Sequence, residues 1–160
     1  MRAQQDDVCC APTEMIMSLP TKLQEIVDDF ASMSREEKLE TLIAYAETFP
    51  PLPERFIGER DKMEAVPECM TPVFIIGEQE ADGGVTFYMD IPPQSPTVRG
   101  LATILANGLN GCKAEEIVSV PADFYQPMKL EETVSGQRLN GFIGLLAHMK
   151  HVAVPYLAKS

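Results

Sequence analysis

The amino-acid sequence predicts an α+β fold in which a small three-stranded antiparallel sheet packs against helices. Segments with apolar residues at helical spacing occupy both ends of the chain, and a β-hairpin pattern lies between them. Proline-rich stretches separate the two kinds of segment. A chain of 160 residues is long enough for one domain with its own core. We therefore expect a flexible leader over residues 1–17 and a single domain over residues 18–160.

Two helices are expected in the first third of the chain. The first begins near Ser18, a suitable N-cap, with Pro20 in its first turn. Its apolar residues recur at helical spacing: Leu19, Leu23, Ile26, Val27 and Phe30. The second begins at Ser34, which forms a capping-box pattern with Glu37, and ends at the prolines of residues 50–53. Its predicted apolar face consists of Leu39, Leu42, Ile43 and Ala46.

The β signal follows a charged surface connection over residues 54–65. A short edge strand is expected at residues 62–66, and a stronger apolar strand at Val73–Gly77. A turn containing Asp82-Gly83-Gly84 leads to the returning strand Val85–Met89. Because an isolated hairpin is unstable in water, helices must cover one face of this sheet.

Three helices are expected after the sheet. Ser95 and Pro96 mark the start of the first, which Asn107-Gly108 ends. Its apolar stripe is formed by Val98, Leu101, Ile104 and Leu105. A short helix at Ala114–Val118 and a turn at residues 121–125 follow. Ser135 caps the last long helix, from about Gln137 to Val154, and Pro155 closes it. The inward positions of this helix are Leu139, Phe142, Leu145, Leu146 and Met149.

Charge and hydropathy exclude several classes of function. The formal net charge of −11 repels nucleic acid and anionic membrane surfaces. No apolar run has the length of a membrane span, and the N-terminus lacks the pattern of a secretory signal. We therefore expect a cytoplasmic protein that binds neither nucleic acid nor membrane. The sequence leaves open whether it is a monomer or a homodimer.

Four cysteines are the candidates for chemistry. Cys9 and Cys10 lie in the expected leader, and Cys112 follows a turn at a helix entry. The spacing contains no CxxC pair and no Cys/His zinc pattern, so we expect no metal site and no cofactor. We interpret Cys9 and Cys10 as incidental thiols and Cys112 as structural. Cys69 is different, because Pro67 and Pro72 bracket it.

Cys69 is expected on a stiff, non-helical loop, since each proline fixes φ and removes a backbone donor. It has two interpretations: a buried, inert side chain or an accessible, reactive thiol. The neighbouring charge of Glu68 opposes formation of the thiolate. Arg99 and Arg138, each in the first turn of a predicted helix, are candidates to support the thiol or a partner. The alternative is that these arginines face solvent or pair with carboxylates.

The histidines do not supply an obvious base for this thiol. His148 and His151 lie near the end of the last helix, on one face, and we expect both to be solvated. A hydrolytic cysteine enzyme needs a base beside its nucleophile, so that class of function is disfavoured.

Four stretches, in order, resemble the SufE family of iron–sulfur cluster assembly proteins. They are residues 34–39 leading to Leu52-Pro53, residues 66–74, residues 95–101 and residues 130–141, within a match from about residue 20 to about residue 153. The resemblance implies a fold related to the U-type scaffold proteins. It also implies a partner and activator of a cysteine desulfurase, rather than an independent enzyme. The family cysteine falls on Cys69, which would accept sulfane sulfur as a persulfide and pass it to a cluster-assembly scaffold.

The loop departs from the family pattern Gly-Cys-Gln-Ser-Gln-Val-Trp. Here it reads Glu68-Cys69-Met70-Thr71-Pro72-Val73-Phe74, which should make it stiffer and less hydrogen-bonding. These departures bear on the speed of sulfur transfer and on the choice of partner. We expect the free protein to shelter Cys69 in an apolar dimple beneath the loop, from which a partner draws it out.

Two other functions remain open on the sequence. A U-type scaffold for an iron–sulfur cluster or zinc would need about three thiolates plus a fourth ligand. A plain protein-interaction module would carry Cys69 as an inert side chain.

Overall fold

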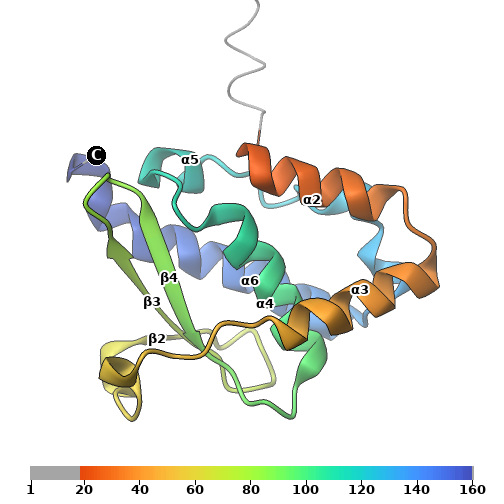
Figure 1. The fold of residues 1–160 in the computed structure, drawn as a ribbon, viewed down its shortest axis with the longest axis horizontal. Coiled ribbons are helices and arrows are strands. Elements are labelled where there is room, and N and C mark those ends of the chain that lie inside the picture. The colour runs from red at the N-terminus through yellow and green to blue at the C-terminus, as the bar shows by residue number, and fades with distance from the viewer. Residues whose placement is uncertain (1–18, 160) are drawn as a thin grey trace, which may run out of the picture.

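The computed structural model describes residues 19–159, so the predicted leader and the predicted cap Ser18 lie outside the described residues. In this part of the chain, five α-helices and a three-stranded antiparallel sheet are present, with the sheet at one side of the molecule (Figure 1), which confirms the α+β class. The helices are α2 (Thr21–Ala31), α3 (Arg35–Glu47), α4 (Pro96–Leu109), α5 (Ala114–Val118) and α6 (Gly136–Ala153). Short 3₁₀ helices lie in the connections and after α6: η1 (Glu54–Phe56), η2 (Arg60–Lys62), η3 (Gln126–Met128), η4 (Leu130–Glu132) and η5 (Val154–Lys159).

The sheet has the order β2-β3-β4, with β2 (Glu64–Ala65), β3 (Phe74–Gln79) and β4 (Val85–Asp90). Its register places Glu64 opposite Ile75, and Gly77 opposite Phe87. Alternate residues of β4 are buried, as expected for a strand with one face on the core. Figure 1 shows α6 running behind the strands. It lies so close to β3 that a Cβ at Gly77 would be 2.7 Å from Val152 Cγ1. The edge strand predicted before Cys69 is present as β2, which pairs with β3.

The side of the molecule away from the sheet is formed by α2 and α3 packed on α4. Nearly every side chain of α4 from Gly100 to Leu109 is buried, which makes it the central helix of the core. Gly100 lies against the backbone of Leu42, where a Cβ would clash. None of the helices in residues 19–159 is long and apolar enough to cross a membrane.

The predicted apolar face of α3 is wrong at two positions. Leu39 and Ile43 are exposed by 45% and 47%, whereas Lys38 is 1% exposed. The buried residues of α3 are instead Lys38 and Leu42, of which Leu42 lies against α4. The Lys38 amine is nevertheless satisfied, because it donates to the Lys129 carbonyl at 3.1 Å and to Glu132 at 3.0 Å. A lysine with a paired amine and a long apolar stem can occupy a core position.

One predicted helix boundary also needs correction. Helix α4 does not end at Asn107-Gly108 but continues to Leu109, because Gly108 is packed against Leu23 of α2. Gly111, with φ of +90°, supplies the left-handed residue just beyond the helix. Ser95 precedes α4 as expected, but its side chain makes no capping hydrogen bond. By contrast, the side chains of Ser34 and Ser135 cap α3 and α6 as predicted, and α5 has the predicted bounds.

Candidate functional site

Cys69 lies on the loop between β2 and β3, which we call the Cys69 loop (residues 66–73). The loop is closed at its base by a hydrogen bond from the Val66 N–H to the Val73 carbonyl, 2.9 Å long. Both valines are 2% exposed, so they anchor the loop in the core. Near the tip, the Cys69 N–H donates to the Val66 carbonyl at 3.2 Å. The Thr71 hydroxyl lies 3.3 Å from the hydroxyl of Ser95, next to α4.

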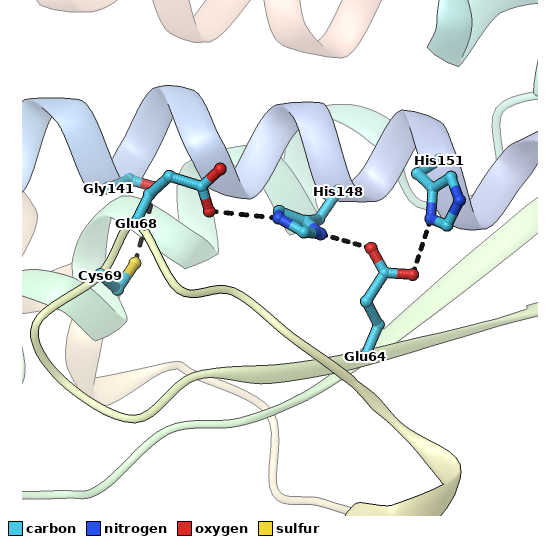
Figure 2. Close-up of polar contacts among 6 residues, drawn as sticks. All are labelled: Glu64, Glu68, Cys69, Gly141, His148 and His151. Carbon is cyan, nitrogen blue, oxygen red and sulfur yellow. Dashed lines mark hydrogen bonds and ion pairs between the residues drawn. The ribbon is translucent and has the colours of Figure 1, made fainter.

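The Cys69 thiol is free and half-buried, and it points toward α6 (Figure 2). Its Sγ atom donates a hydrogen bond to the Gly141 carbonyl, at 3.6 Å. Burial raises the pKa of the Cys69 thiol, and the negative charge of Glu68 raises it further. In this conformation the side chain is therefore held in its protonated, weakly nucleophilic form at neutral pH.

Two glycines of α6 allow the loop to lie directly on the helix. A Cβ at Gly141 would be 2.8 Å from Cys69 Sγ, and a Cβ at Gly144 would be 2.6 Å from Glu68 Cβ. Real Cβ atoms do not approach other atoms so closely. Gly141 and Gly144 are three residues apart and share one face of the helix. We call this pair the glycine seat, because no larger side chain fits beneath Glu68 and Cys69 in this conformation.

A cavity of about 280 Å³ opens beside the thiol, with Cys69 in its wall. Its floor is apolar and comes from α4 and α6: Val98, Leu101, Phe142 and Leu145. Ser135, Gln137 and Arg138, at the start of α6, supply polar groups to the same cavity. Met70, the residue after Cys69, also lines it but is 80% exposed. The expected apolar dimple beneath the loop is thus present, although it is built from the helices more than from the loop's own valines.

The two arginines predicted to support the thiol lie in different surroundings. Arg138 lines the cavity together with Cys69. Arg99 does not line it. Its guanidinium donates to the Ile91 carbonyl from Nε at 3.0 Å and from Nη2 at 2.7 Å, and it lies 4.8 Å above the Phe49 ring. A role of either arginine toward the thiol stays a prediction, and the geometry favours Arg138.

The structure also joins the two histidines of α6 to Glu64 and Glu68, a connection that the sequence pattern did not indicate (Figure 2). His148 lies between two carboxylates. Its Nε2 is 3.1 Å from Glu68 Oε1, and its Nδ1 contacts Glu64. The other carboxylate oxygen of Glu64 is 2.7 Å from Nδ1 of His151.

The expectation that both histidines are solvated is therefore wrong for His148. Its side chain is 21% exposed, against 73% for His151. Burial alone would raise the pKa of Glu64, but the hydrogen bonds with His148 and His151 outweigh it, so that the pKa is lowered. One sequence signal was available. Positions 141, 144 and 148 fall on one face of a helix, so the histidine lies in line with the two glycines.

No group of three or more His, Cys, Asp or Glu side chains within residues 19–159 is arranged to hold a metal ion. Cys112 is 9% exposed, and its Sγ faces the Gly108 carbonyl at 3.7 Å. This agrees with its interpretation as a structural side chain. Cys9 and Cys10 lie outside the described residues.

Comparison with known proteins gives a consistent result across the chain. Residues 24–153 match the family model described as "SufE: Fe-S metabolism associated domain". An uncharacterised SufE-like protein of Mycobacterium tuberculosis is 38% identical over 133 residues, which cover 83% of this chain and 92% of that protein. The SufE-like protein 1 of Arabidopsis thaliana, named as chloroplastic/mitochondrial, is 31% identical over 140 residues. These cover 87% of this chain and 36% of the plant protein.

The fold has a close counterpart among solved structures. The solution structure of a hypothetical protein from Thermus thermophilus superimposes with a TM-score of 0.78 at 32% sequence identity. The alignment covers 88% of this chain and 99% of that one. The same arrangement of helices and sheet therefore occurs in a relative of nearly the same extent.

Proposed function

The chain belongs to the SufE family, whose domain is associated with iron–sulfur metabolism, and from this premise we propose that it is a sulfur acceptor that uses Cys69. In this proposal, Cys69 takes sulfane sulfur from the persulfide of a cysteine desulfurase and thereby activates that enzyme. The protein then passes the sulfur to a scaffold for iron–sulfur cluster assembly. It acts as a carrier and activator, not as an independent enzyme.

The observation that supports this role best is the position of one free thiol on an anchored loop, at the wall of a cavity of about 280 Å³. Transfer between thiols requires only a positioned, accessible thiolate. In the described part of the chain, no histidine has a hydrogen bond to the Cys69 sulfur. The hydrogen bond that this sulfur makes there is to the Gly141 carbonyl. A desulfurase that supplies its own proton acceptor would complete the chemistry.

The proposed transfer balances without an oxidant or a reductant. The Cys69 thiol loses its proton, and the thiolate attacks the outer sulfur of the donor persulfide. A sulfur–sulfur bond forms at Cys69 while the bond between the two sulfur atoms of the donor breaks. The donor cysteine leaves as a thiolate and takes up a proton. One sulfane sulfur atom has moved, and the donor thiol is regenerated.

The resting geometry implies that the loop must open before this reaction. With its Sγ directed at Gly141, its side chain half-buried and its pKa raised, Cys69 offers a bulky donor only partial access and little thiolate. A partner would lift the loop from the glycine seat. Met70, whose side chain is 80% exposed beside the thiol, is the apolar group placed to meet that partner first.

The departures from the family pattern fit a loop that moves as a unit. Pro72 stiffens the chain just before the anchor Val73, and Met70 replaces a hydrogen-bonding residue with an apolar one. We propose that Arg138, in the cavity wall, favours the thiolate or contacts the donor once the loop has opened.

The proposed place of action is the cytoplasm. Cys69 and Cys112, the cysteines within the described residues, are both free thiols, as expected in a reducing compartment. The plant relative carries an organellar name, so its site of action differs from the one that we propose here.

Stimulation of a desulfurase tests the proposal. The protein, the cysteine desulfurase of the same organism and free cysteine are mixed, and alanine production is followed under multiple turnover. The wild type should raise the rate, and Cys69→Ser should not. Cys112→Ser is the matched control, because it removes a buried thiol outside the cavity lining, and it should stimulate like the wild type. Equal stimulation by wild type and Cys69→Ser would refute the proposed role of Cys69.

A further inference from the structure

The most unusual feature near the Cys69 loop is the position of His148 between two acidic side chains from different segments. Glu64 belongs to β2, just before the loop, and Glu68 is part of the loop itself. His148 comes from α6, one turn beyond Gly144 of the glycine seat. Figure 2 shows the three side chains in a row, with His151 at the far end. The row therefore joins the helix, the strand and the residue preceding the thiol.

The chemistry of the contacts makes this row an attractive interaction. An ionised carboxylate only accepts hydrogen bonds, so His148 satisfies both carboxylates at once in the form that carries a proton on each ring nitrogen. A histidine with both nitrogens protonated is a cation, and its bonds to carboxylates are charge-assisted and stronger than neutral ones. The contact to Glu64 also fixes the plane of the ring. It thereby aims Nε2 at Glu68, 3.1 Å away.

We propose that Glu64, His148 and Glu68 form a latch that holds the Cys69 loop on α6 and sets how often the thiol is exposed. His148 and Glu64 are then positioning residues for Cys69, because they act through Glu68 and do not touch the sulfur. The latch rests on the proposed sulfur-acceptor function in one respect: sulfur transfer is the reaction for which the loop must open. The latch itself is a property of the free protein.

The layout of the loop supports a role in exposure, not merely in folding. Glu68 and Cys69 occupy adjacent places above Gly144 and Gly141, so release of Glu68 removes the support next to the sulfur. Two weaker ties then remain near the tip: the Sγ–Gly141 bond of 3.6 Å, which is long and involves a weak donor, and the contact of 3.3 Å between the Thr71 and Ser95 hydroxyls. The base of the loop stays anchored by Val66 and Val73 in either state. Opening can thus be local.

Alkylation of the free protein by iodoacetamide measures this exposure without any sulfur donor. The rate is read on the peptide that contains Cys69, by mass spectrometry after rapid quenching. If the loop must open first, the rate is proportional to the open population. His148→Ala removes the latch, and we expect alkylation of Cys69 to become about tenfold faster. His148→Gln, which retains one donor, should react at a rate between those of the wild type and His148→Ala.

Two controls separate a latch from a general loss of structure. His151→Ala removes the other imidazole that contacts Glu64. His151 has its hydrogen bond to Glu64 and not to the Cys69 loop, so this variant should change the rate of Cys69 alkylation less than about twofold. Cys112 is buried on another part of the chain, and its alkylation should stay at the wild-type rate in every variant.

A double-mutant cycle supplies the decisive readout, because a purely structural histidine would not depend on Glu68. In the Glu68→Ala background, His148→Ala should add less than about twofold to the rate of Cys69 alkylation. Any effect of Glu68 on thiol ionisation is common to both members of that pair and cancels. Equal effects of His148→Ala in both backgrounds, wild-type rates in both His148 variants, or a parallel rise at Cys112 in both variants would each overturn the latch. None of these results depends on sulfur acceptance, which is measured separately with a desulfurase.

Discussion

The carboxylate of Glu68 lies 3.1 Å from Nε2 of His148, so the residue before the candidate sulfur-carrying thiol is joined to the last long helix. The sulfur of Cys69 itself contacts the same helix at Gly141, one of the two glycines on which the loop rests. The closed state of the loop thus depends on α6 as well as on the bracketing prolines. The following predictions test the parts of that arrangement.

Gly141→Ala should push the thiol away from α6. The added Cβ would lie 2.8 Å from Cys69 Sγ, so the sulfur would have to leave its place against Gly141, whereas Cys69 Cα, at 3.4 Å, would be in ordinary van der Waals contact. We expect alkylation of Cys69 to become about fivefold faster, which corresponds to about 1 kcal/mol of lost loop closure. Alkylation kinetics on the isolated protein would measure it.

Gly136→Ala is the matched control for that variant. Gly136 begins the same helix, and a Cβ there would have nothing within 4 Å. Alanine favours the helix at both positions, by up to about 1 kcal/mol in the interior at Gly141 and by less at Gly136, the first residue of α6. If Gly141→Ala left the alkylation rate as unchanged as Gly136→Ala, the loop would not be seated on the glycines.

The pH dependence of Cys69 alkylation should report its raised pKa. Burial and the charge of Glu68 both raise the pKa, so the rate in the wild type should reach its midpoint above the value of about 8.5 for a free cysteine. Glu68→Gln removes the negative charge but retains an oxygen that can accept from His148, so that part of the burial is kept. Its midpoint should therefore fall, while staying above that of a free cysteine. A rate profile from pH 6 to pH 10 shows the shift.

Glu25→Gln, an exposed position on α2, serves as the control for charge removal and should leave the midpoint in place. An unchanged or higher midpoint in Glu68→Gln would mean that the carboxylate does not act on the thiol.

Glu64→Gln should reduce stability in a pH-dependent way. The pKa of Glu64 is lowered in the folded protein, so its contribution is present above the ordinary glutamate pKa of about 4.3 and is lost as pH falls through the lowered value. We expect a loss of roughly 1 kcal/mol in the free energy of unfolding at pH 7, since the carboxylate is only partly buried. Urea unfolding at pH 7 and at pH 3.5 should show the difference between variant and wild type shrinking in acid. A difference that is equal at both pH values would count against a charged Glu64–His148 contact.

Lys38 should contribute more through its stem than through its charge. Its amine is buried, but its partner Glu132 is 49% exposed and can return to water when the amine is removed. We therefore expect Lys38→Met to cost about 1 kcal/mol, and Lys38→Ala about 3 kcal/mol because it leaves a cavity. Denaturant unfolding of the two variants makes the comparison. Equal losses would assign the stabilisation to the ion pair instead of the packing.

Local signals in the sequence were sufficient for much of the fold. The capping serines 34 and 135 placed two helix starts, and the bounds of α5 follow from its own residues. The Gly-rich turn and the alternating strand placed the hairpin. The prolines around Cys69 placed the thiol on an anchored loop next to β3. All of these features depend on neighbours within a few residues.

Contacts between distant residues account for what the sequence pattern missed. The buried Lys38 pairs with Glu132, which lies 94 positions further along the chain. The periodicity of α3 gives no sign of a partner so far away in the sequence. His148 meets Glu64 across 84 positions, a contact that no local pattern around His148 indicates. The sequence likewise does not distinguish Arg138, which lines the cavity, from Arg99, which binds the Ile91 carbonyl. Arg99 and Arg138 both lie in the first turn of their helices, but of the two only Arg138 lines the cavity.

The most direct test of the central claim is the mass of the protein after reaction with a desulfurase. The desulfurase of the same organism is charged with cysteine, mixed with an excess of this protein, and the products are trapped with an alkylating reagent. We predict that the wild type and Cys112→Ser gain one sulfur atom on the peptide containing Cys69, and that Cys69→Ser gains none. A wild-type protein whose Cys69 peptide gains no sulfur, although the desulfurase carries its persulfide, would contradict the account.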